Sequence, residues 1–263
     1  MITPDIQQQE SFNVLLIGDS CVDEYKIGTV DRLSPEAPVP VIKVTNTFTV
    51  PGMAANVEKN LINIGVFADF VTNTETIIKT RYIDQRSNQH MLRVDTEPEV
   101  KQWNGESPQP LDAYDAIVIS DYNKGFLSYD NIEYIIKESS GPVFIDTKKQ
   151  DLSRFSADWC FVKINESEFK QRFSIPKNLI VTLGSNGASL KRFSDEKHFT
   201  TKSVDVVDVC GCGDTFLASL AVEYLYTKNI EKSIEFANLA AGITVQHQGN
   251  YAPSYDEIRN ARK

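Results

Sequence analysis

The chain has 263 residues, of which 41% are hydrophobic and 24% are charged, a composition typical of a globular protein with its own core. Its formal net charge of −9 argues against a nucleic-acid surface, because binding a phosphate backbone requires a concentrated basic face. The four cysteines show no framework spacing and no apolar stretch approaches membrane-spanning length, so we expect a soluble cytoplasmic protein that binds neither nucleic acid nor a membrane.

The first third of the chain predicts a buried strand, a helix and a group of exposed strands. Residues 13–17 form an apolar run typical of a parallel strand, and the run ends at Gly18 and Asp19. Residues 53–64 have a helical pattern that Gly65 closes. We assign the exposed strands, including 39–50, 80–83 and 89–94, to a lid that covers roughly residues 25–50 and 78–95.

From residue 116 onward, strands and helices alternate regularly. Apolar runs followed by polar residues or glycine predict strands at 116–120, 143–145, 160–164 and 179–182. Helices are predicted at 129–138, from Gly213 to Thr227, at 231–246 and from Ser254. The pattern predicts one α/β domain over residues 1–263, with a mostly parallel central sheet flanked by helices and a small β-sheet lid. Open α/β sheets place their sites at the carboxyl ends of the strands, so the polar residues there are candidates for function.

The segment Asp-Val-Cys-Gly-Cys-Gly-Asp-Thr, from Asp208 to Thr215, carries the strongest functional signal. Its glycines allow backbone N–H groups to converge, and the apolar helical run behind it adds the positive end of a helix dipole. Such a loop holds an anion, and Asp214 has a use beside an anion if it accepts a proton from a hydroxyl nucleophile. The segment therefore indicates phosphoryl transfer, although a plain glycine-rich loop with Asp214 capping the helix explains it equally well.

Further segments stand in a recognisable order along nearly the whole chain. They are Gly18-Asp19 with Asp23 and Tyr25, the run from Arg32 to Val41, Pro51 to Val57, Ser87-Asn88-Gln89, Leu92 to Asp95, Ser120 to Gly125, and Asn165 to Phe169. Together with the glycine-rich loop, they resemble the ribokinase-like (PfkB) family of carbohydrate kinases. The Gly-x-Gly-Asp loop alone identifies only that superfamily, whereas the Ser-Pro-Glu-Ala-Pro-Val-Pro-Val run is specific for its heptose 7-phosphate kinase branch.

The resemblance implies a ribokinase-like fold and a kinase that uses ATP and Mg²⁺. The implied reaction is phosphorylation of the anomeric hydroxyl of a heptose 7-phosphate, a small-molecule sugar phosphate, to the 1,7-bisphosphate. Asp214 is the implied base, and the amides of Gly211, Cys212 and Gly213 form the implied anion hole for the transferring group. Because lid strands expose an edge and an apolar face, we also expect a homodimer through the lid.

The resemblance also assigns residues to the two substrates. Those implied for the sugar phosphate are Asp19, Gly52, Met53, Asn56, Arg93, Asp121 and Lys124, with Arg93 and Lys124 on its distal phosphate. Those implied for the nucleotide are Lys148, Asn165, Glu168, Thr182, Gly184, Gly187 and Asn238, with Glu168 ordering Mg²⁺ through water. Taken alone, Asp19 and the segment from Asp121 to Gly125 are also ordinary turn signals.

Some features depart from the family pattern. Met53 stands where relatives carry a second glycine, so we expect its side chain to project toward the sugar and to alter the pocket. Cys210 and Cys212 replace other small residues, which catalysis should tolerate because the anion hole uses backbone groups. Residues 66–71 are expected to pass almost directly into the lid strands, and residues 169–178 to lack a helix. We expect the chain to correspond to the kinase half of bifunctional members, without their nucleotidyltransferase half.

Two other functions fit the sequence. The first is a kinase for another sugar or sugar phosphate, which Met53 favours. The second is a degenerate, non-catalytic protein that binds a sugar or nucleotide, which the shortened segments favour. The presence of Asp214 and its glycines opposes the second alternative, because a chain that has drifted without catalysis has no need of a base.

Overall fold

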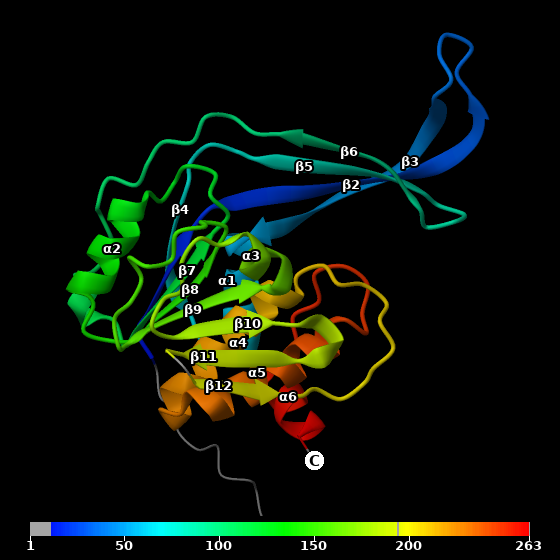
Figure 1. The fold of residues 1–263 in the computed structure, drawn as a ribbon. Helices are drawn as coiled ribbons and strands as arrows, with labels where there is room; N and C mark the ends of the chain where they lie inside the picture. The colour runs from blue at the N-terminus through cyan, green and yellow to red at the C-terminus, as the bar shows by residue number, and fades with distance from the viewer. Residues whose placement is uncertain (1–11, 194, 263) are drawn as a thin grey trace, which may run out of the picture.

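The computed structural model describes residues 12–193 and 195–262, which form two sheets of different size (Figure 1). The larger sheet has eight strands in the order β12-β11-β10-β9-β8-β7-β1-β4 and forms the body of the molecule. The smaller sheet has four strands in the order β3-β2-β5-β6 and extends away from the body as a long arm. Within the described ranges, no helix is both long and apolar enough to cross a membrane.

The body sheet is parallel over most of its width. Its strands are β1 (Val14–Gly18), β4 (Ala68–Thr72), β7 (Ala116–Asp121), β8 (Val143–Thr147), β9 (Cys160–Asn165), β10 (Leu179–Thr182), β11 (Ala188–Arg192) and β12 (Asp195–Phe199). All pairs from β4 to β10 are parallel, whereas β11 and β12 add an antiparallel edge. Strands β1, β7 and β8 are buried along their whole length, because helices cover both faces of the sheet. The predicted mostly parallel sheet is confirmed.

Strand β4 corrects an expectation drawn from the sequence. We expected residues 66–71 to lead almost directly into the lid. Instead, β4 pairs in parallel with β1, with Leu16 opposite Phe70, and closes one edge of the body sheet. Its five residues are all only partly buried, so its apolar pattern is weaker than that of the central strands.

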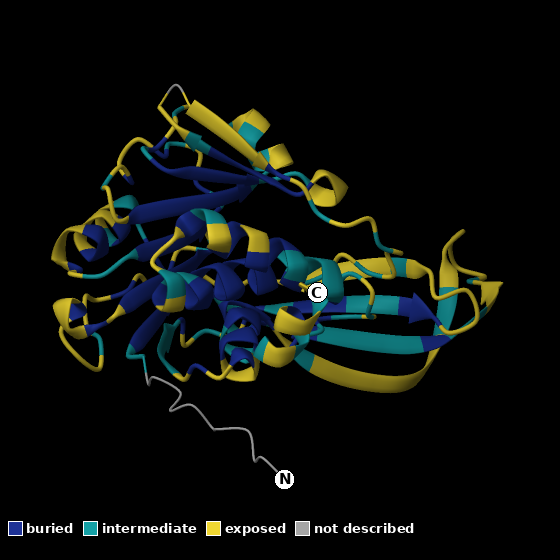
Figure 2. Ribbon diagram, turned by 90° about the horizontal axis from the view of Figure 1, so that it is seen from below, coloured by how far each residue is buried: buried dark blue, intermediate teal, exposed yellow. Residues whose placement is uncertain are grey.

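The smaller sheet is the lid. Its strands are β2 (Ser20–Leu33), β3 (Pro40–Met53), β5 (Ile78–Asp84) and β6 (His90–Thr96). Strand β2 follows β1 after a single residue, so the chain runs from the body into the lid without a loop. The strands predicted at 80–83 and 89–94 are confirmed as β5 and β6, which pair as an antiparallel hairpin. The lid is buried at its root and exposed toward its tip, as Figure 2 shows.

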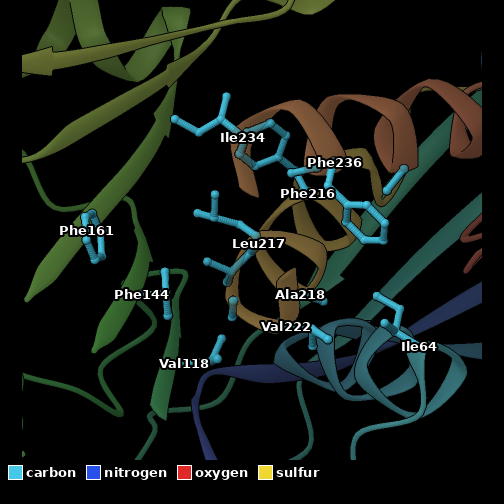
Figure 3. Close-up of a cluster of buried hydrophobic side chains, with 14 of the residues drawn as sticks. Ile64, Val118, Phe144, Phe161, Phe216, Leu217, Ala218, Val222, Ile234 and Phe236 are labelled. Atoms are coloured by element: carbon cyan, nitrogen blue, oxygen red, sulfur yellow. The ribbon is translucent and has the colours of Figure 1, made fainter. Parts of the chain in front are cut away.

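Helices complete both faces of the body sheet. They are α1 (Ala54–Ile64), α2 (Tyr129–Glu138), α3 (Glu166–Gln171), α4 (Cys212–Thr227), α5 (Ile230–Thr244) and α6 (Tyr255–Ala261), with 3-10 turns at Leu111–Ala113 and Gly184–Asn186. Side chains of α1, α4 and α5 join one core cluster, and side chains of α2 join the cluster on the other face. Figure 3 shows Phe144 and Phe161 of the sheet on the side where Leu217 of α4 and Ile234 of α5 lie.

Helix α4 lies at the centre of this arrangement. It is buried along almost its whole length, from Asp214 to Glu223, instead of along one stripe. A helix buried on all sides has to carry small and apolar residues around its whole circumference, as the run from Phe216 to Val222 does. Its packing fixes the N-terminal turn of α4, and therefore the glycine-rich loop, against the carboxyl ends of the central strands.

A buried ion pair anchors the loop that follows β7. The Asp121 carboxylate accepts hydrogen bonds from Thr147 Oγ1 at 2.5 Å and from the backbone N–H of Asn123 at 3.0 Å. Lys149 Nζ lies 3.1 Å from Asp121 Oδ2 and donates to the carbonyl of Leu127 at 2.9 Å. Both oxygens of Asp121 are thus engaged inside the protein. This position gives Asp121 a structural role and does not support the expected role in sugar binding.

The ion pair between Asp121 and Lys149 predicts a large contribution to the free energy of unfolding. Lys149→Ala leaves the Asp121 carboxylate buried without its cation, so we expect the free energy of unfolding to fall by about 3–5 kcal/mol. Urea unfolding followed by circular dichroism measures this change. The matched control is Lys170→Ala, because Lys170 forms an exposed ion pair with Glu166 on α3 and should contribute nothing measurable. Equal urea midpoints for the two variants would contradict the prediction.

Candidate active site

The glycine-rich loop forms the start of α4 and exposes the backbone amides of its first turn. Gly211 is the N-cap and has φ 76°, a left-handed conformation that favours glycine. A Cβ at Gly211 would also approach Asn56 Nδ2 to 2.8 Å, so the position has no room for a side chain. The first amides of a helix have no carbonyl partner within the helix, and the dipole adds positive charge there. The loop therefore has the geometry of the expected anion hole at Gly211, Cys212 and Gly213.

Asp214 is a buried carboxylate held from two sides. Its Oδ2 accepts a hydrogen bond from Asn56 Nδ2 at 2.8 Å, and its Oδ1 accepts one from the Tyr122 hydroxyl at 3.0 Å. Burial raises the pKa of Asp214 to about 6, while the hydrogen bond from Asn56 acts in the opposite direction. Asp214 is thus mostly ionised at neutral pH, yet more basic than an exposed aspartate. These are the properties of a general base.

A second buried ion pair contacts the backbone of the glycine-rich loop. Lys163 Nζ lies 2.7 Å from Asp146 Oδ2 and 3.4 Å from the carbonyl oxygen of Gly213. The other oxygen of Asp146, Oδ1, is buried and has no hydrogen-bond partner among the described residues. The sequence reasoning missed the role of Lys163. Its signal was a lysine inside the otherwise apolar strand 160–164, where a charge requires a buried partner.

One cavity of about 220 Å³ adjoins the anion hole. It brings together four residues predicted for the nucleotide and two predicted for the anion hole, namely Thr182, Gly184, Gly187, Asn238, Cys212 and Gly213. The sequence reasoning missed its apolar lining, which includes Val206, Val209, Phe216, Ala241 and Val245. Asn238 donates a hydrogen bond to the carbonyl of Phe199 at 3.1 Å, so β12 holds its amide at the wall. An apolar cavity with a few polar groups at one end suits a flat base joined to phosphates.

Asn165 and Glu168 form the capping box of α3. Asn165 accepts from the backbone N–H of Glu168 at 2.9 Å, and Glu168 accepts from the N–H of Asn165 at 2.8 Å. Glu168 also pairs with Lys148. Burial alone would lower the pKa of Lys148, but the nearby carboxylates of Asp146 and Glu168 raise it above its ordinary value. Asn165 at the end of β9 and Glu168 of α3 are therefore held together by the capping box, and Glu168 lies beside Lys148, which is also close to Asp146.

A magnesium ion would have oxygen ligands here but no complete protein cage. Among residues 12–193 and 195–262, no group of three or more His, Cys, Asp or Glu side chains is arranged to hold a metal ion. The unpartnered Oδ1 of Asp146 and the carboxylate of Glu168 nevertheless supply the type of oxygen that Mg²⁺ prefers. Because Mg²⁺ keeps much of its water, two such carboxylates fit a largely hydrated ion.

The structure gives Asp19 and Asp23 different positions. The carboxylate of Asp19 accepts the backbone N–H groups of Lys124 at 3.2 Å and Phe126 at 3.3 Å, which ties down the loop after β7. Asp23 forms a mostly buried ion pair with Arg81 at 2.6 Å. Its Oδ2 lies against Gly52, where a Cβ would come within 2.4 Å. Asp23 therefore lies against the predicted sugar residue Gly52 and is paired with Arg81, and the sequence reasoning gave neither Asp23 nor Arg81 a role.

Basic side chains gather where the lid meets the loop after β7. Arg93 forms a two-pronged pair with Asp95, at 2.7 and 2.8 Å, and lies opposite Arg81 in the β5–β6 register. Lys124 pairs with Glu97 at 2.5 Å. Lys79 of β5 was not predicted, and its ammonium lies 5.3 Å from the centre of the Tyr122 ring. The structure thus places Arg93 and Lys124 on the lid side of the site, each already paired with a carboxylate.

Met53 does not project into open space. Its side chain is 3% exposed and belongs to the core cluster that contains Cys21 and Ile77. Its backbone has φ 57° and ψ −132°, a conformation unusual for a residue other than glycine. An influence of Met53 on the sugar pocket would therefore act through the backbone at the start of α1, which corrects the expectation of a protruding side chain.

Sequence comparison finds curated relatives of this chain among bifunctional enzymes. The Bifunctional protein HldE of a Nitratiruptor species is 31% identical over 299 residues, which cover 93% of this chain and 64% of the relative. The HldE protein of Klebsiella pneumoniae (strain 342) is 32% identical over 310 residues, with 96% and 64% covered. The chain thus spans less than two thirds of the length of these relatives.

Solved structures share the fold at lower identity. A ribokinase from Thermotoga maritima matches with a TM-score of 0.71 at 19% identity, covering 95% of this chain and 99% of that one. The ribokinase of Arabidopsis thaliana, solved with ribose and ATP, matches with a TM-score of 0.72 at 14% identity, covering 96% and 99%. Both likenesses show a ribokinase-like α/β fold with a separate small sheet.

The family model described as pfkB family carbohydrate kinase matches residues 42–257, a range that includes the β5–β6 hairpin, the residues that line the 220 Å³ cavity and the glycine-rich loop. The fold, the buried Asp214 and the HldE relatives agree with that match. This chain belongs to the pfkB family of carbohydrate kinases.

Proposed function

We propose that this kinase uses ATP and Mg²⁺ to phosphorylate the anomeric hydroxyl of a sugar phosphate, with a heptose 7-phosphate as its favoured substrate. The observation that carries the proposal is the position of Asp214, a buried carboxylate at the start of α4 whose neighbours Cys212 and Gly213 line the adjoining cavity. The HldE relatives and the run from Ser34 to Val41 support the heptose.

The proposed chemistry follows from the residues around Asp214. Asp214 takes the proton of the attacking hydroxyl, while the amides of Gly211, Cys212 and Gly213 stabilise the charge on the transferring group. Asn56 holds Asp214 in place through its Nδ2 group. The Oδ1 atom of Asn56 has no partner among the described residues and can accept a hydrogen bond from a sugar hydroxyl. When bound, Mg²⁺ would neutralise charge on the nucleotide phosphates, and Asp146 and Glu168 would hold it through water.

Cations of the lid and of the loop after β7 support a substrate that carries its own phosphate. Arg93 of β6, Lys79 of β5 and Lys124 of the loop after β7 all lower the pKa of Asp95, and Arg81 lies opposite Arg93 in the β5–β6 register. Arg81 is committed to buried Asp23, whereas Arg93 is half exposed and paired only within its own strand, with Asp95. Arg93 can therefore leave Asp95 and bind a phosphate group with little loss of free energy, because exposed ion pairs are weak.

The proposed base predicts a specific loss of activity. Asp214→Asn preserves the shape of the side chain but replaces one of its two accepting oxygens by an NH₂ group and removes the proton acceptor, so we expect kcat to fall by roughly 10²- to 10⁴-fold. A coupled assay of ADP release, run over heptose, hexose and pentose phosphates, measures the effect. Asp112→Asn, at an exposed aspartate in the 3-10 turn before β7, is the control. Undiminished activity of Asp214→Asn would remove the base from the mechanism.

The phosphate-binding role of Arg93 separates this substrate class from an unphosphorylated sugar. With a sugar phosphate as substrate, Arg93→Ala should raise KM for the sugar roughly tenfold or more, as expected for a lost charge-assisted hydrogen bond. The control is Arg86→Ala, because Arg86 is an exposed lid arginine paired with Asp31. Steady-state kinetics with varied sugar phosphate measure both. An unchanged KM in Arg93→Ala would favour a kinase for a different sugar.

We also propose that the kinase forms a homodimer through its lid and acts in the cytoplasm. Both edge strands of the lid, β3 and β6, leave backbone groups unpaired within the described chain, and they expose apolar side chains such as Val44, Leu92 and Val94. Unprotected edges of this kind are normally covered. All four cysteines are free thiols, which suits a reducing compartment that also supplies ATP.

The proposed interface predicts a change in mass. Leu92→Asp places a charge in the middle of the exposed face of β6, so we expect it to convert a dimer to a monomer in sedimentation experiments. Phe67→Asp is the control, because Phe67 is an exposed aromatic residue that precedes β4, at the end of that strand away from the lid. A monomeric wild-type protein, or a dimer that survives Leu92→Asp, would contradict the interface.

A further inference from the structure

Tyr122 makes a contact that neither the sequence reasoning nor the family match assigns. Its hydroxyl donates a hydrogen bond to Asp214 Oδ1 at 3.0 Å, from the loop after β7. Asn56 of α1 binds the other oxygen at 2.8 Å. The two donors come from different elements and bind opposite oxygens, so together they fix the plane of the carboxylate.

The ring of Tyr122 is itself held in place. The ammonium groups of Lys79 and Lys148 lie 5.3 and 5.2 Å from its centre, one from lid strand β5 and the other from the residue after β8. Cations at this distance attract the face of an aromatic ring. The ring therefore has contacts with the lid and the body sheet, and its hydroxyl is directed at the base.

We infer that Tyr122 is a positioning residue, which holds the Asp214 carboxylate in the orientation needed to accept the proton of the sugar hydroxyl. The inference rests on the proposed function, because it takes Asp214 as the base. Tyr122 does not line the cavity beside the glycine-rich loop, and its hydrogen bond is made to Asp214, so we place its role at the proposed base. The contact acts through the hydroxyl, the atom of Tyr122 that donates to Asp214.

The protonation states of Tyr122 and Asp214 agree with a hydrogen bond in which the Tyr122 hydroxyl is the donor and the Asp214 carboxylate the acceptor. Burial and the neighbouring Asp214 carboxylate raise the pKa of Tyr122 well above its ordinary value, so the phenol stays protonated at every working pH. The donor is therefore always Tyr122, and it favours the ionised form of Asp214.

Other titratable groups also interact with Asp214 and influence its pKa together with Tyr122. They are Asp146 from β8, Lys148 from the residue after β8, Lys163 from β9, Cys21 from β2, and Cys210 and Cys212 from the loop itself. Removing the Tyr122 hydroxyl leaves all of them in place. A change in the titration of Asp214 in such a variant is therefore attributable to the lost donor.

Tyr122→Phe tests the inference by removing one oxygen atom. We expect kcat to fall roughly 10- to 100-fold, the effect of losing a hydrogen bond to a charged group, with KM for ATP unchanged. In the wild type, kcat/KM should decline as the pH falls below about 6, because the base becomes protonated. In Tyr122→Phe this decline, the acidic limb of the pH profile, should move to higher pH by about one unit, because the ionised form of Asp214 has lost a hydrogen-bond donor.

Tyr129→Phe is the matched control. Tyr129 is also partly buried and also lies near two cations, Lys149 at 5.3 Å and Arg154 at 5.8 Å. Its hydroxyl accepts a hydrogen bond from the backbone N–H of Asp151 and does not touch Asp214. Tyr129→Phe should therefore leave kcat and the acidic limb unchanged. A role of Tyr122 that is merely structural would change thermal stability without moving the limb.

A second variant keeps the inference testable if Tyr122→Phe folds poorly. Incorporating 3-fluorotyrosine at position 122 preserves the ring and makes the hydroxyl a stronger donor, so the acidic limb should move to lower pH. A limb that moves in neither variant would overturn the inference. If Asp214→Asn is inactive while Tyr122→Phe behaves as wild type, only this inference fails. If Asp214→Asn retains full activity, the proposed base itself fails.

Discussion

Burial of one carboxylate determines how the rest of the site is built. Asp214 lies inside the protein, where desolvation disfavours its charge and raises its pKa. Two neutral donors, Asn56 and Tyr122, hold the ion without neutralising it. A direct partner such as lysine would stabilise the charge more strongly, but it would also lower the basicity on which proton transfer depends. Lys163 is instead paired with Asp146 and influences Asp214 only from a distance.

Three other buried carboxylates near the site are paired with cations, whereas Asp214 is held only by the neutral donors Asn56 and Tyr122 among the described residues. Asp121 pairs with Lys149, Asp146 with Lys163, and Asp23 with Arg81. Each pair lies at the carboxyl ends of the body strands or at the root of the lid, and each fixes a loop or strand that reaches the site. Because breaking a buried pair leaves an unpartnered charge, these pairs make the positions of the loops costly to change.

The sequence predicted the parts of the fold that have strong periodic patterns. Strands β1, β7, β8 and β9 are short apolar runs followed by polar residues, and the helices that flank them have clear start and stop signals. Strand β4 was not predicted, because its residues are only partly buried and it therefore lacks a continuous apolar run. Residues 195–197 suggested a solvated turn between strands, but they belong to β12, which is almost wholly exposed and carries mostly polar residues.

The site was predictable where chemistry dictates the residue type, and less so where only the fold brings residues together. Glycines and an aspartate before an apolar helix indicate a candidate anion site from sequence, and the structure brings Cys212, Gly213 and the buried Asp214 together beside a cavity. No pattern links Tyr122 or Asn56 to Asp214, because 92 and 158 residues separate them along the chain. Met53 shows a further limit: with φ 57° in place of a glycine, it costs the fold about 1–3 kcal/mol of backbone strain, offset by its buried side chain. The strained residue immediately precedes α1, the helix that carries Asn56, so packing in the core there is tied to the position of the hydrogen bond from Asn56 to Asp214.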